Sequence, residues 1–408
     1  MRVIVLNDHG RVNGGAAQVA ISSLNALAQA GLDVTFISSV PPVAPGIRPD
    51  LVRIINFGFH DLLGNPSKLD AAWHGIWDAR SGKRLRALLH DYSPSDTIIH
   101  LHSWVQSLSS SVVHTARELG FEIVCTLHDY FAVCPNGGLF NFRHRAQCQL
   151  EPMSLRCVAT NCDSRSYSQK LWRVGRQYVQ NNAGSVPEIG NFITVSEYSE
   201  SLLRPLLPAG SRFFRVRNPI DIPRLPPSDI GNSDAFTFVG RLSPEKGPDV
   251  FAAAAQQAGV KAAFTGTGPE DATIIALNPQ AEFHGWQDRT GVVDRIRRSR
   301  AVVLPSLSHE TQGLVVMEAA ALGVPAIVSD RCAARDSVVD GVTGLLFRTG
   351  DVSDLAAKLT LLKQDSNLAE TLGRKAYEHY WKNPCSLEAH IEDLITCYER
   401  VLGGQLAT

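Results

Sequence analysis

The sequence predicts an α/β protein made of two successive halves, each built on a doubly wound parallel sheet. Short apolar runs alternate with helical stretches along the chain, as expected for βαβ units. The runs are continuously apolar, which is typical of strands covered by helices on both faces. A stretch rich in proline and polar residues, 218–233, interrupts this rhythm, and the rhythm then begins again.

The first half begins with a strand at residues 3–6, a glycine-bearing turn, and a helix over residues 16–30 that Gly31 ends. Four more apolar runs are predicted strands: 34–37, 97–101, 122–127 and 192–195.

The second half begins with a strand at residues 236–239 and a helix at 248–258. Four further runs are predicted strands: 262–265, 281–284, 301–304 and 326–329. The last segment, from about residue 386, is a predicted amphipathic helix with an apolar stripe: Leu387, Ile391, Leu394, Ile395, Tyr398 and Leu402. We therefore expect one domain over residues 1–218 and a second over 219–385, followed by a helix over 386–408.

Composition excludes several classes of protein. A length of 408 residues suits two or three domains, and a net charge of −1 gives no reason to expect a nucleic-acid partner. Neither a signal peptide nor a long apolar span is visible, so a cytoplasmic protein is expected. The dinucleotide fingerprint G-x-G-x-x-G is absent after the first strand, which disfavours a nicotinamide oxidoreductase.

Two cations follow the first strand of the second half. Arg241 and Lys246 lie in the segment 240–247, just before a predicted helix. A guanidinium and an ammonium beside a helix N-terminus suit a diphosphate. The alternative is ordinary solvated surface charge.

Two carboxylates, Glu310 and Glu318, are separated by seven residues and span the entry into a helix. Carboxylates accept hydrogen bonds from vicinal hydroxyls, so the pair suits a sugar or a ribose. The alternative is acidic charge favoured by the helix dipole. The helix entry itself contains Gly313, Leu314 and Val315.

Three further features follow predicted strands. Gly14 and Gly15 suit either phosphate approach to a helix N-terminus or an ordinary βα turn. A second glycine-bearing turn contains Gly266 and Gly268. His128, with Asp129 beside it, is either an oriented imidazole at the site or a structural histidine.

Residues 164–187 contain no acidic side chain, and Lys170, Arg173 and Arg176 recur at helical spacing. The stretch is either a helix packed on the core or a basic face for a membrane or an anionic acceptor. The basic-face interpretation predicts peripheral contact with the inner face of the membrane.

Four cysteines fall within one stretch without clear secondary structure: Cys134, Cys148, Cys157 and Cys162. Four thiolates could hold a structural zinc that orders this loop. The alternatives are buried thiols and, less expected in a reducing compartment, disulfides.

Taken together, these motifs resemble the retaining glycosyltransferases of family 4, which have the GT-B fold. The resemblance covers nearly the whole chain and is strongest over residues 305–329, which hold the E-x7-E pattern as Glu310 and Glu318. Segments 240–247, 266–269 and 218–221, the last beginning with Asn218, also match. The family usually has Gly and Phe after the first Glu, where this chain has Thr311 and Gln312.

The resemblance implies two Rossmann-like domains that face a cleft, with the C-terminal helix crossing back to the first domain. It implies that Arg241 and Lys246 hold the diphosphate of a UDP- or GDP-sugar without a catalytic metal. Glu318 would bind the ribose and Glu310 the donor sugar, and His128 would lie near the reacting sugar. Gly15 would approach the diphosphate from the opposite domain.

The acceptor is expected to be a carbohydrate, a lipid-linked molecule or a small molecule. Two alternatives to a glycosyltransferase are a catalytically silent nucleotide-sugar-binding or interaction protein on the same fold and a pyridoxal-phosphate phosphorylase. The second is disfavoured, since no lysine context suits that cofactor and the chain is short for the class.

Overall fold

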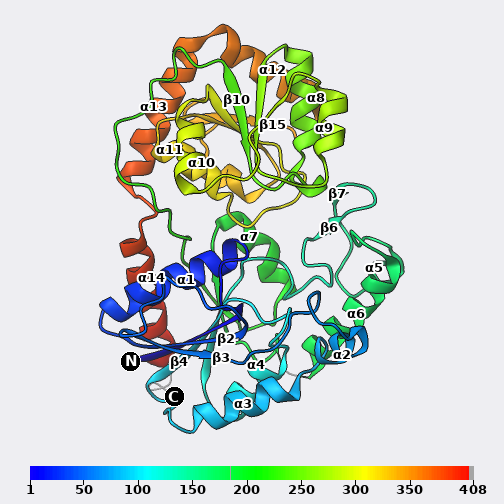
Figure 1. The fold of residues 1–408 in the computed structure, drawn as a ribbon, viewed down its shortest axis with the longest axis vertical. Helices are drawn as coiled ribbons and strands as arrows, with labels where there is room; N and C mark the ends of the chain where they lie inside the picture. Colours follow the sequence, from blue (N-terminus) through cyan, green and yellow to red (C-terminus); the bar gives the residue numbers. More distant parts are fainter. Residues whose placement is uncertain (184, 404–408) are drawn as a thin grey trace. The chain divides into compact units, whose positions relative to one another are not determined.

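The computed structural model describes residues 1–183 and 185–403, which form two compact units (Figure 1). Unit 1 comprises Met1–Gly138, Leu150–Pro219 and the C-terminal segment from Leu387. Unit 2 comprises Leu139–Gln149 and Ile220–Ser386. Each unit has its own sheet and its own hydrophobic core.

Unit 1 is built on a seven-stranded parallel sheet. In spatial order its strands are β3 (Val52–Asn56), β2 (Asp33–Val40), β1 (Arg2–His9), β4 (Thr97–Leu101), β5 (Glu122–Thr126), β8 (Asn191–Thr194) and β9 (Arg212–Arg215). Its helices are α1 (Gly15–Gln29), α2 (Lys68–His74), α3 (Ala79–Leu89), α4 (Ser111–Glu118), α5 (Leu155–Ala159), α6 (Tyr167–Asn182), α7 (Glu197–Leu203) and α14 (Leu387–Gly403). The strand order reverses between β1 and β4, as in a doubly wound sheet.

Unit 2 is built on a six-stranded parallel sheet. In spatial order its strands are β12 (Glu282–Phe283), β11 (Lys261–Thr265), β10 (Ala235–Val239), β13 (Ala301–Leu304), β14 (Ala326–Ser329) and β15 (Gly344–Phe347). Its helices are α8 (Pro248–Ala258), α9 (Asp271–Leu277), α10 (Arg289–Arg297), α11 (Leu314–Ala321), α12 (Val352–Gln364) and α13 (Ser366–Lys382). Here the order reverses between β10 and β13.

The sheet registers explain why the strands read as unbroken apolar runs. Val3 of β1 pairs with Val34 on one side and Ile98 on the other, and all three side chains are buried. With helices on both faces, successive residues of an inner strand all meet apolar neighbours. Every predicted strand is present in one of the two parallel sheets, which confirms the α/β prediction.

Three strands of the two parallel sheets have no counterpart among the predictions: β3, β9 and β15. β3 and β9 are the edge strands of their sheet and are only partly buried, so their sequences lack a continuous apolar run. β15 is also an edge strand, and it begins at a glycine, Gly344.

The C-terminal helix α14 packs in unit 1. Ile391, Leu394, Tyr398 and Val401 join the apolar cluster that also contains β1 and β2 side chains. Tyr398 is one of the largest side chains that are fully buried in the described part of the chain.

The segment Leu139–Gln149 clusters with unit 2, although the sequence analysis placed it inside the first domain. It forms a two-stranded hairpin, β6 (Phe140–Asn141) and β7 (Ala146–Gln147). The physical reason is its packing: Phe140 is fully buried in the apolar cluster of unit 2. Arg145 forms ion pairs with Asp249 at 2.7 Å and Glu270 at 3.2 Å.

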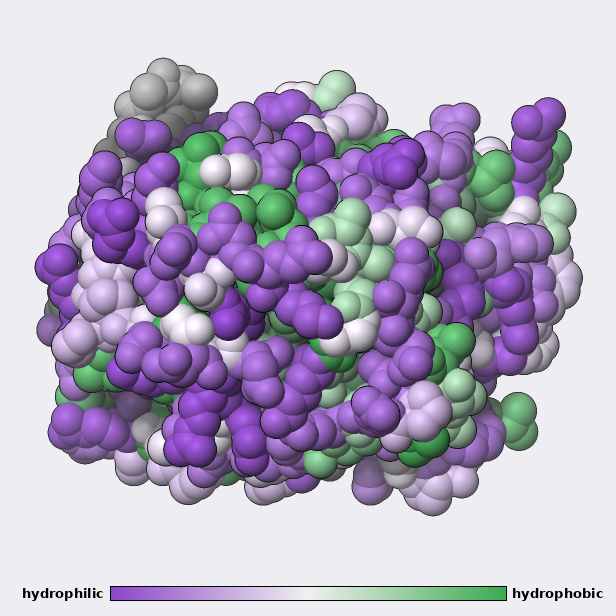
Figure 2. Space-filling view, turned by 90° about the horizontal axis from the view of Figure 1, so that it is seen from above, coloured by the Kyte–Doolittle hydropathy of each residue, from purple (hydrophilic) through white to green (hydrophobic). Residues whose placement is uncertain are grey.

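The face of the molecule in Figure 2 is mainly hydrophilic, with hydrophobic side chains in small groups. Of the helices in residues 1–183 and 185–403, none has the length and apolar character needed to cross a membrane.

Candidate functional site

Two loops of unit 2 meet where its strand order reverses, between β10 and β13. Doubly wound sheets bind ligands at the carboxyl ends of the strands that flank such a reversal. The Leu307 and Ser308 backbone amides, after β13, both donate to the Glu245 carbonyl, after β10, at 3.0 Å. These two bonds hold the loops together and bring Lys246 to Glu310.

The Lys246 ammonium and the Glu310 carboxylate form the central contact of this site. Lys246 Nζ lies 2.7 Å from both Oε1 and Oε2 of Glu310, and the Ser306 hydroxyl also donates to Oε1. Burial disfavours the charged carboxylate, but Lys246 and Ser306 outweigh it and hold the pKa of Glu310 below its usual value. The Glu310 carboxylate is therefore ionised at neutral pH.

The backbone is in the left-handed region both at Gly247, beside Lys246, and at Glu310. Gly247 has a φ of 65°, and a Cβ there would lie 2.3 Å from the Pro305 carbonyl oxygen. Glu310 has a φ of 52°, a left-handed conformation that costs roughly 1–3 kcal/mol in a residue other than glycine. Such strain is concentrated at functional sites, where the surrounding contacts maintain it.

Arg241 lies on the loop that carries Lys246, and its side chain is 70% exposed. Its Nη2 lies 3.2 Å from Glu245 Oε1, which also accepts a hydrogen bond from Ser243 Oγ at 2.7 Å. An exposed pair of this kind contributes little to stability. Arg241 can therefore turn to a ligand at small cost.

The second carboxylate has a partner that the sequence analysis did not identify. Glu318, within α11, lies 3.0 Å from Nη1 of Arg289, the first residue of α10. Arg289 also donates to the Asp221 carbonyl through Nη2 at 2.7 Å and Nε at 3.1 Å. Burial raises the pKa of Glu318, and Arg289 opposes that effect. No spacing in the sequence links α10 to α11, so only the tertiary structure reveals this pair.

The glycines after β11 permit close contact between loops. A Cβ on Gly266 would lie 1.9 Å from the Gly240 carbonyl oxygen, and one on Gly268 would lie 2.1 Å from the Leu242 carbonyl oxygen. The absence of side chains here is thus a packing requirement of the fold. Donor binding by these two residues stays a prediction.

The helix entry predicted at residues 313–315 is present. Gly313 precedes α11 with a φ of 81°, and a Cβ there would meet Ala334 at 2.5 Å. Leu314 and Val315 form the half-buried first turn of α11.

Four other predicted site residues lie in unit 1. Gly14 and Gly15 are exposed at the start of α1, and a Cβ on either would meet nothing within 4 Å. Asn218 is buried at the end of the unit, and His128 follows β5.

His128 belongs to a cluster of buried imidazoles. Its Nε2 lies 2.8 Å from His102 Nδ1, and the two rings are stacked. His100 bonds Tyr398 of α14 at 2.6 Å and Thr126 at 2.7 Å. Burial lowers the pKa of both His100 and His128 to about 3. The imidazole at the predicted sugar contact is therefore neutral at physiological pH.

A fourth buried histidine makes folding pH-dependent. Burial lowers the pKa of His390 in α14 to about 4 from an ordinary 6.5, while its bond to the Arg217 carbonyl opposes the shift. The unfolded chain binds a proton between pH 6.5 and 4 that the folded chain does not bind. The free energy of unfolding should therefore fall with decreasing pH, by about 1.4 kcal/mol per pH unit from this group.

We expect His390→Asn to reduce the slope of unfolding free energy against pH over pH 4–6.5. The expected reduction corresponds to about one bound proton, or about 1.4 kcal/mol per pH unit. Urea unfolding at stepped pH values measures this slope. His379→Asn, at an exposed position of α13, is the matched control and should leave the slope unchanged. An unchanged slope in the His390 variant would show that His390 is not the titrating group.

The basic stretch of residues 164–187 is not a basic surface face, which corrects the membrane interpretation. Lys170 is fully buried and Arg176 is 4% exposed, so neither can meet a membrane surface. Arg173 pairs with the buried carboxylate of Asp163 at 3.1 Å. The helix α6 packs on unit 1 through these long side chains.

The predicted four-cysteine zinc site is not assembled. Among residues 1–183 and 185–403, no three His, Cys, Asp or Glu side chains are placed to hold a metal ion. Lys170 explains why: its Nζ lies 3.2 Å from Cys162 Sγ and 3.6 Å from Cys157 Sγ. A buried ammonium stands beside the sulfurs where the prediction required a metal. Cys134 is also buried, whereas Cys148 follows the hairpin in unit 2.

Comparisons with known families cover both halves of the chain. Residues 13–224 match the model described as glycosyltransferase family 4, and residues 227–379 match the model described as glycosyl transferases group 1.

Curated relatives agree with these matches. A D-inositol 3-phosphate glycosyltransferase of Kribbella flavida is 32% identical over 35% of this chain and 38% of its own length, so that match covers well under half of the relative. A glycogen synthase of Mycobacterium tuberculosis is 26% identical over 90% of this chain and 86% of its own length.

Solved structures share the fold. A sucrose-phosphate synthase of Thermosynechococcus elongatus has a TM-score of 0.73 at 17% identity, covering 99% of both chains. HepE of Anabaena, in complex with UDP, has a TM-score of 0.68 at 16% identity, covering 98% of this chain and all of its own. With two parallel-sheet units present, these likenesses confirm the GT-B fold prediction.

Proposed function

Since the chain belongs to glycosyltransferase family 4, we propose that it transfers a hexosyl group from a UDP- or GDP-sugar to an acceptor hydroxyl with retention at the anomeric carbon. The acceptor would be a carbohydrate, a lipid-linked molecule or a small molecule. The observation that carries the proposal is the Lys246–Glu310 pair at the strand-order reversal of unit 2.

The Lys246–Glu310 pair leaves one N–H group of the ammonium available to a ligand. An ammonium has three N–H donors, and two of those on Lys246 are directed to the two oxygens of Glu310. The third can reach a diphosphate oxygen, since the Lys246 side chain is 28% exposed. The exposed Arg241 guanidinium can donate two parallel hydrogen bonds to two further oxygens of the diphosphate.

These cations would act on the leaving group. As the bond between the anomeric carbon and the diphosphate oxygen breaks, negative charge grows on that oxygen. A preorganised cation stabilises this charge more in the transition state than in the substrate. In this proposal the acceptor oxygen forms the new bond and its proton passes to the departing diphosphate, so no catalytic metal is required. Glu310 would contact the donor sugar, and His128 would lie near the reacting carbon as a neutral imidazole.

Glu318 is proposed to accept hydrogen bonds from the ribose hydroxyls. Arg289 holds one of its oxygens, which fixes the carboxylate and favours its charged form. Arg289 would then act as a positioning residue for nucleotide binding.

We expect Glu318→Gln to weaken binding of UDP or GDP at least tenfold, with folding intact. Titration calorimetry with each free nucleotide measures this and identifies the base. Glu282→Gln is the matched control, since Glu282 is partly exposed and lies 3.1 Å from Lys261 and 3.8 Å from His284. Unchanged affinity in the Glu318 variant would refute the ribose role.

Measuring donor consumption by the unmodified protein distinguishes a glycosyltransferase from a catalytically silent binding protein. A glycosyltransferase should consume its donor slowly even without acceptor, and proton NMR of the product reports the anomeric configuration. Nucleotide binding without any donor consumption would favour a catalytically silent binding protein.

A further inference from the structure

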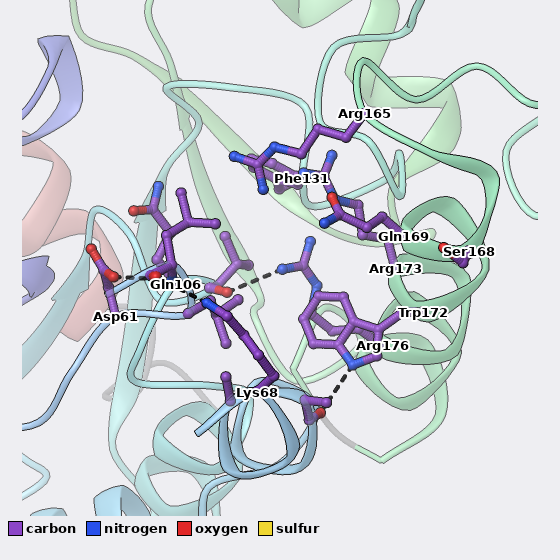
Figure 3. Close-up of a pocket in the computed structure, with 15 residues that line it drawn as sticks. Asp61, Lys68, Gln106, Phe131, Arg165, Ser168, Gln169, Trp172, Arg173 and Arg176 are labelled. Atoms are coloured by element: carbon purple, nitrogen blue, oxygen red, sulfur yellow. Dashed lines mark hydrogen bonds between the residues drawn. The ribbon is translucent and has the colours of Figure 1, made fainter. Parts of the chain in front are cut away.

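Unit 1 contains a pocket of about 530 Å³ (Figure 3). Among the residues that the sequence analysis singled out, only Arg173 and Arg176 line it. Its walls come from the segment between β3 and α2, α2 itself, the loops after β4 and β5, and α6 with the residues just before it. A volume of this size suits a small ligand such as a sugar or a substituted polyol. All the residues that line it belong to unit 1.

Arg176 is the feature of this pocket that points to a ligand. It is 4% exposed, and its Nη1 donates to the Val105 carbonyl at 3.1 Å. Its Nε and Nη2 are buried without a hydrogen-bond partner in the described part of the chain. Buried polar groups in proteins are almost always hydrogen-bonded, and an unsatisfied charged one is costly. Burial lowers the pKa of Arg176 to about 10, although Asp129 and Asp8 oppose the shift.

Three other cations line the same pocket. Lys68 of α2 and Arg165 before α6 are exposed, and Arg173 is partly exposed and paired with Asp163. Asp61 is the one acidic side chain among the lining residues. The lining thus carries more basic than acidic side chains.

Two aromatic rings define the walls. Phe131 and Trp172 lie on the Arg176 guanidinium, at 5.2 Å and 5.4 Å from ring centroid to Cζ. Trp172 is fixed by its Nε1 bond to the Ala72 carbonyl at 2.9 Å. Aromatic faces beside cations suit the apolar face of a sugar ring that carries a charged substituent.

We propose that this pocket binds an oxyanion, a phosphate or a carboxylate, on the sugar or polyol acceptor. The proposal rests on the proposed function, because it assigns the acceptor of that reaction. Two oxygens of a phosphate or a carboxylate can accept hydrogen bonds at once from a guanidinium, which would satisfy the unpartnered Nε and Nη2 of Arg176. The exposed Lys68 and Arg165 would then close around the remaining oxygens.

The test is binding of small probes to the full chain without any nucleotide. Calorimetry at low salt compares glucose 6-phosphate, glucuronate and glucose, which carry a phosphate, a carboxylate and no charge. We expect saturable binding of at least one charged probe, at least tenfold tighter than that of glucose. The ratio between the charged probes distinguishes a phosphate site from a carboxylate site.

Two variants locate the probe. Arg176→Lys removes the forked donor set but keeps the charge, and it should weaken the bound probe at least tenfold. Because Arg176 is buried, the exposed double variant Lys68→Gln with Arg165→Gln tests the same pocket without risk to the core, and it should also weaken binding. Lys83→Gln, at an exposed position of α3 outside the pocket, should leave binding unchanged.

Equal affinity for all three probes, or unchanged affinity in both pocket variants, would overturn the proposal. Failure of the donor site gives a different result: nucleotide binding is lost while the probe still binds. UDP or GDP titration of the pocket variants makes this distinction, since they should bind nucleotide like the unmodified chain.

Discussion

Lys246→Ala should lower kcat/KM for glycosyl transfer at least tenfold, a loss of about 1.4 kcal/mol of transition-state stabilisation. In the proposed mechanism, the variant removes a cation that stabilises the leaving diphosphate. It also leaves the Glu310 carboxylate, 11% exposed, without its counter-ion. Removing one partner of a buried pair destabilises by about 3–5 kcal/mol, so stability must be measured beside activity.

A double variant separates these two effects. Lys246→Ala with Glu310→Gln removes the uncompensated charge, so unfolding stability should recover while the rate stays low. Lys261→Ala is the control, because its pair with Glu282 is about 44% exposed on both sides and should matter little. Near-normal kinetics in the Lys246 single variant would refute the assignment of the diphosphate site.

Gly268→Ala should destabilise unit 2 by about 3 kcal/mol. The new Cβ would lie 2.1 Å from the Leu242 carbonyl oxygen, which itself accepts a hydrogen bond from the Glu270 amide at 3.1 Å. A backbone atom cannot move aside as a flexible side chain can, so the loops after β10 and β11 must separate. Thermal unfolding followed by circular dichroism measures the loss.

Gly231→Ala is the matched control within the same unit. A Cβ there would meet the terminal carboxylate oxygen of Glu370 at 2.1 Å, which a rotation of that side chain relieves. Equal stability of the two glycine variants would show that the loop contact at Gly268 is loose and that a glycine is not required there for packing.

The sequence was sufficient for the inner strands of both sheets. Residues 98–101 and 302–304 are apolar at every position but His100, because helices cover both faces of their strands. Edge strands such as β9 have one open side and alternate less clearly, so no local pattern identifies them. The hairpin around Arg145 clusters with unit 2 although it lies within the first half of the chain, because chain order does not reveal which core a short segment joins.

The motifs of unit 2 were likewise readable from the sequence, since each follows an apolar run. Their partners were not. Arg289 reaches Glu318 from a different helix, and Ser306 reaches Glu310 across a turn with left-handed backbone. Such contacts depend on which strands are neighbours, and strand order is a property of the whole sheet.

The basic helix shows most clearly what tertiary structure alone decided. The sequence determined that Lys170, Arg173 and Arg176 lie on one helix at regular spacing. Only packing decided that Lys170 turns to the Cys162 thiol and that Arg176 is buried in a pocket wall. The same long side chain can be solvated at a surface or buried beside a partner, and the neighbouring segments, distant in sequence, determine which state has the lower free energy.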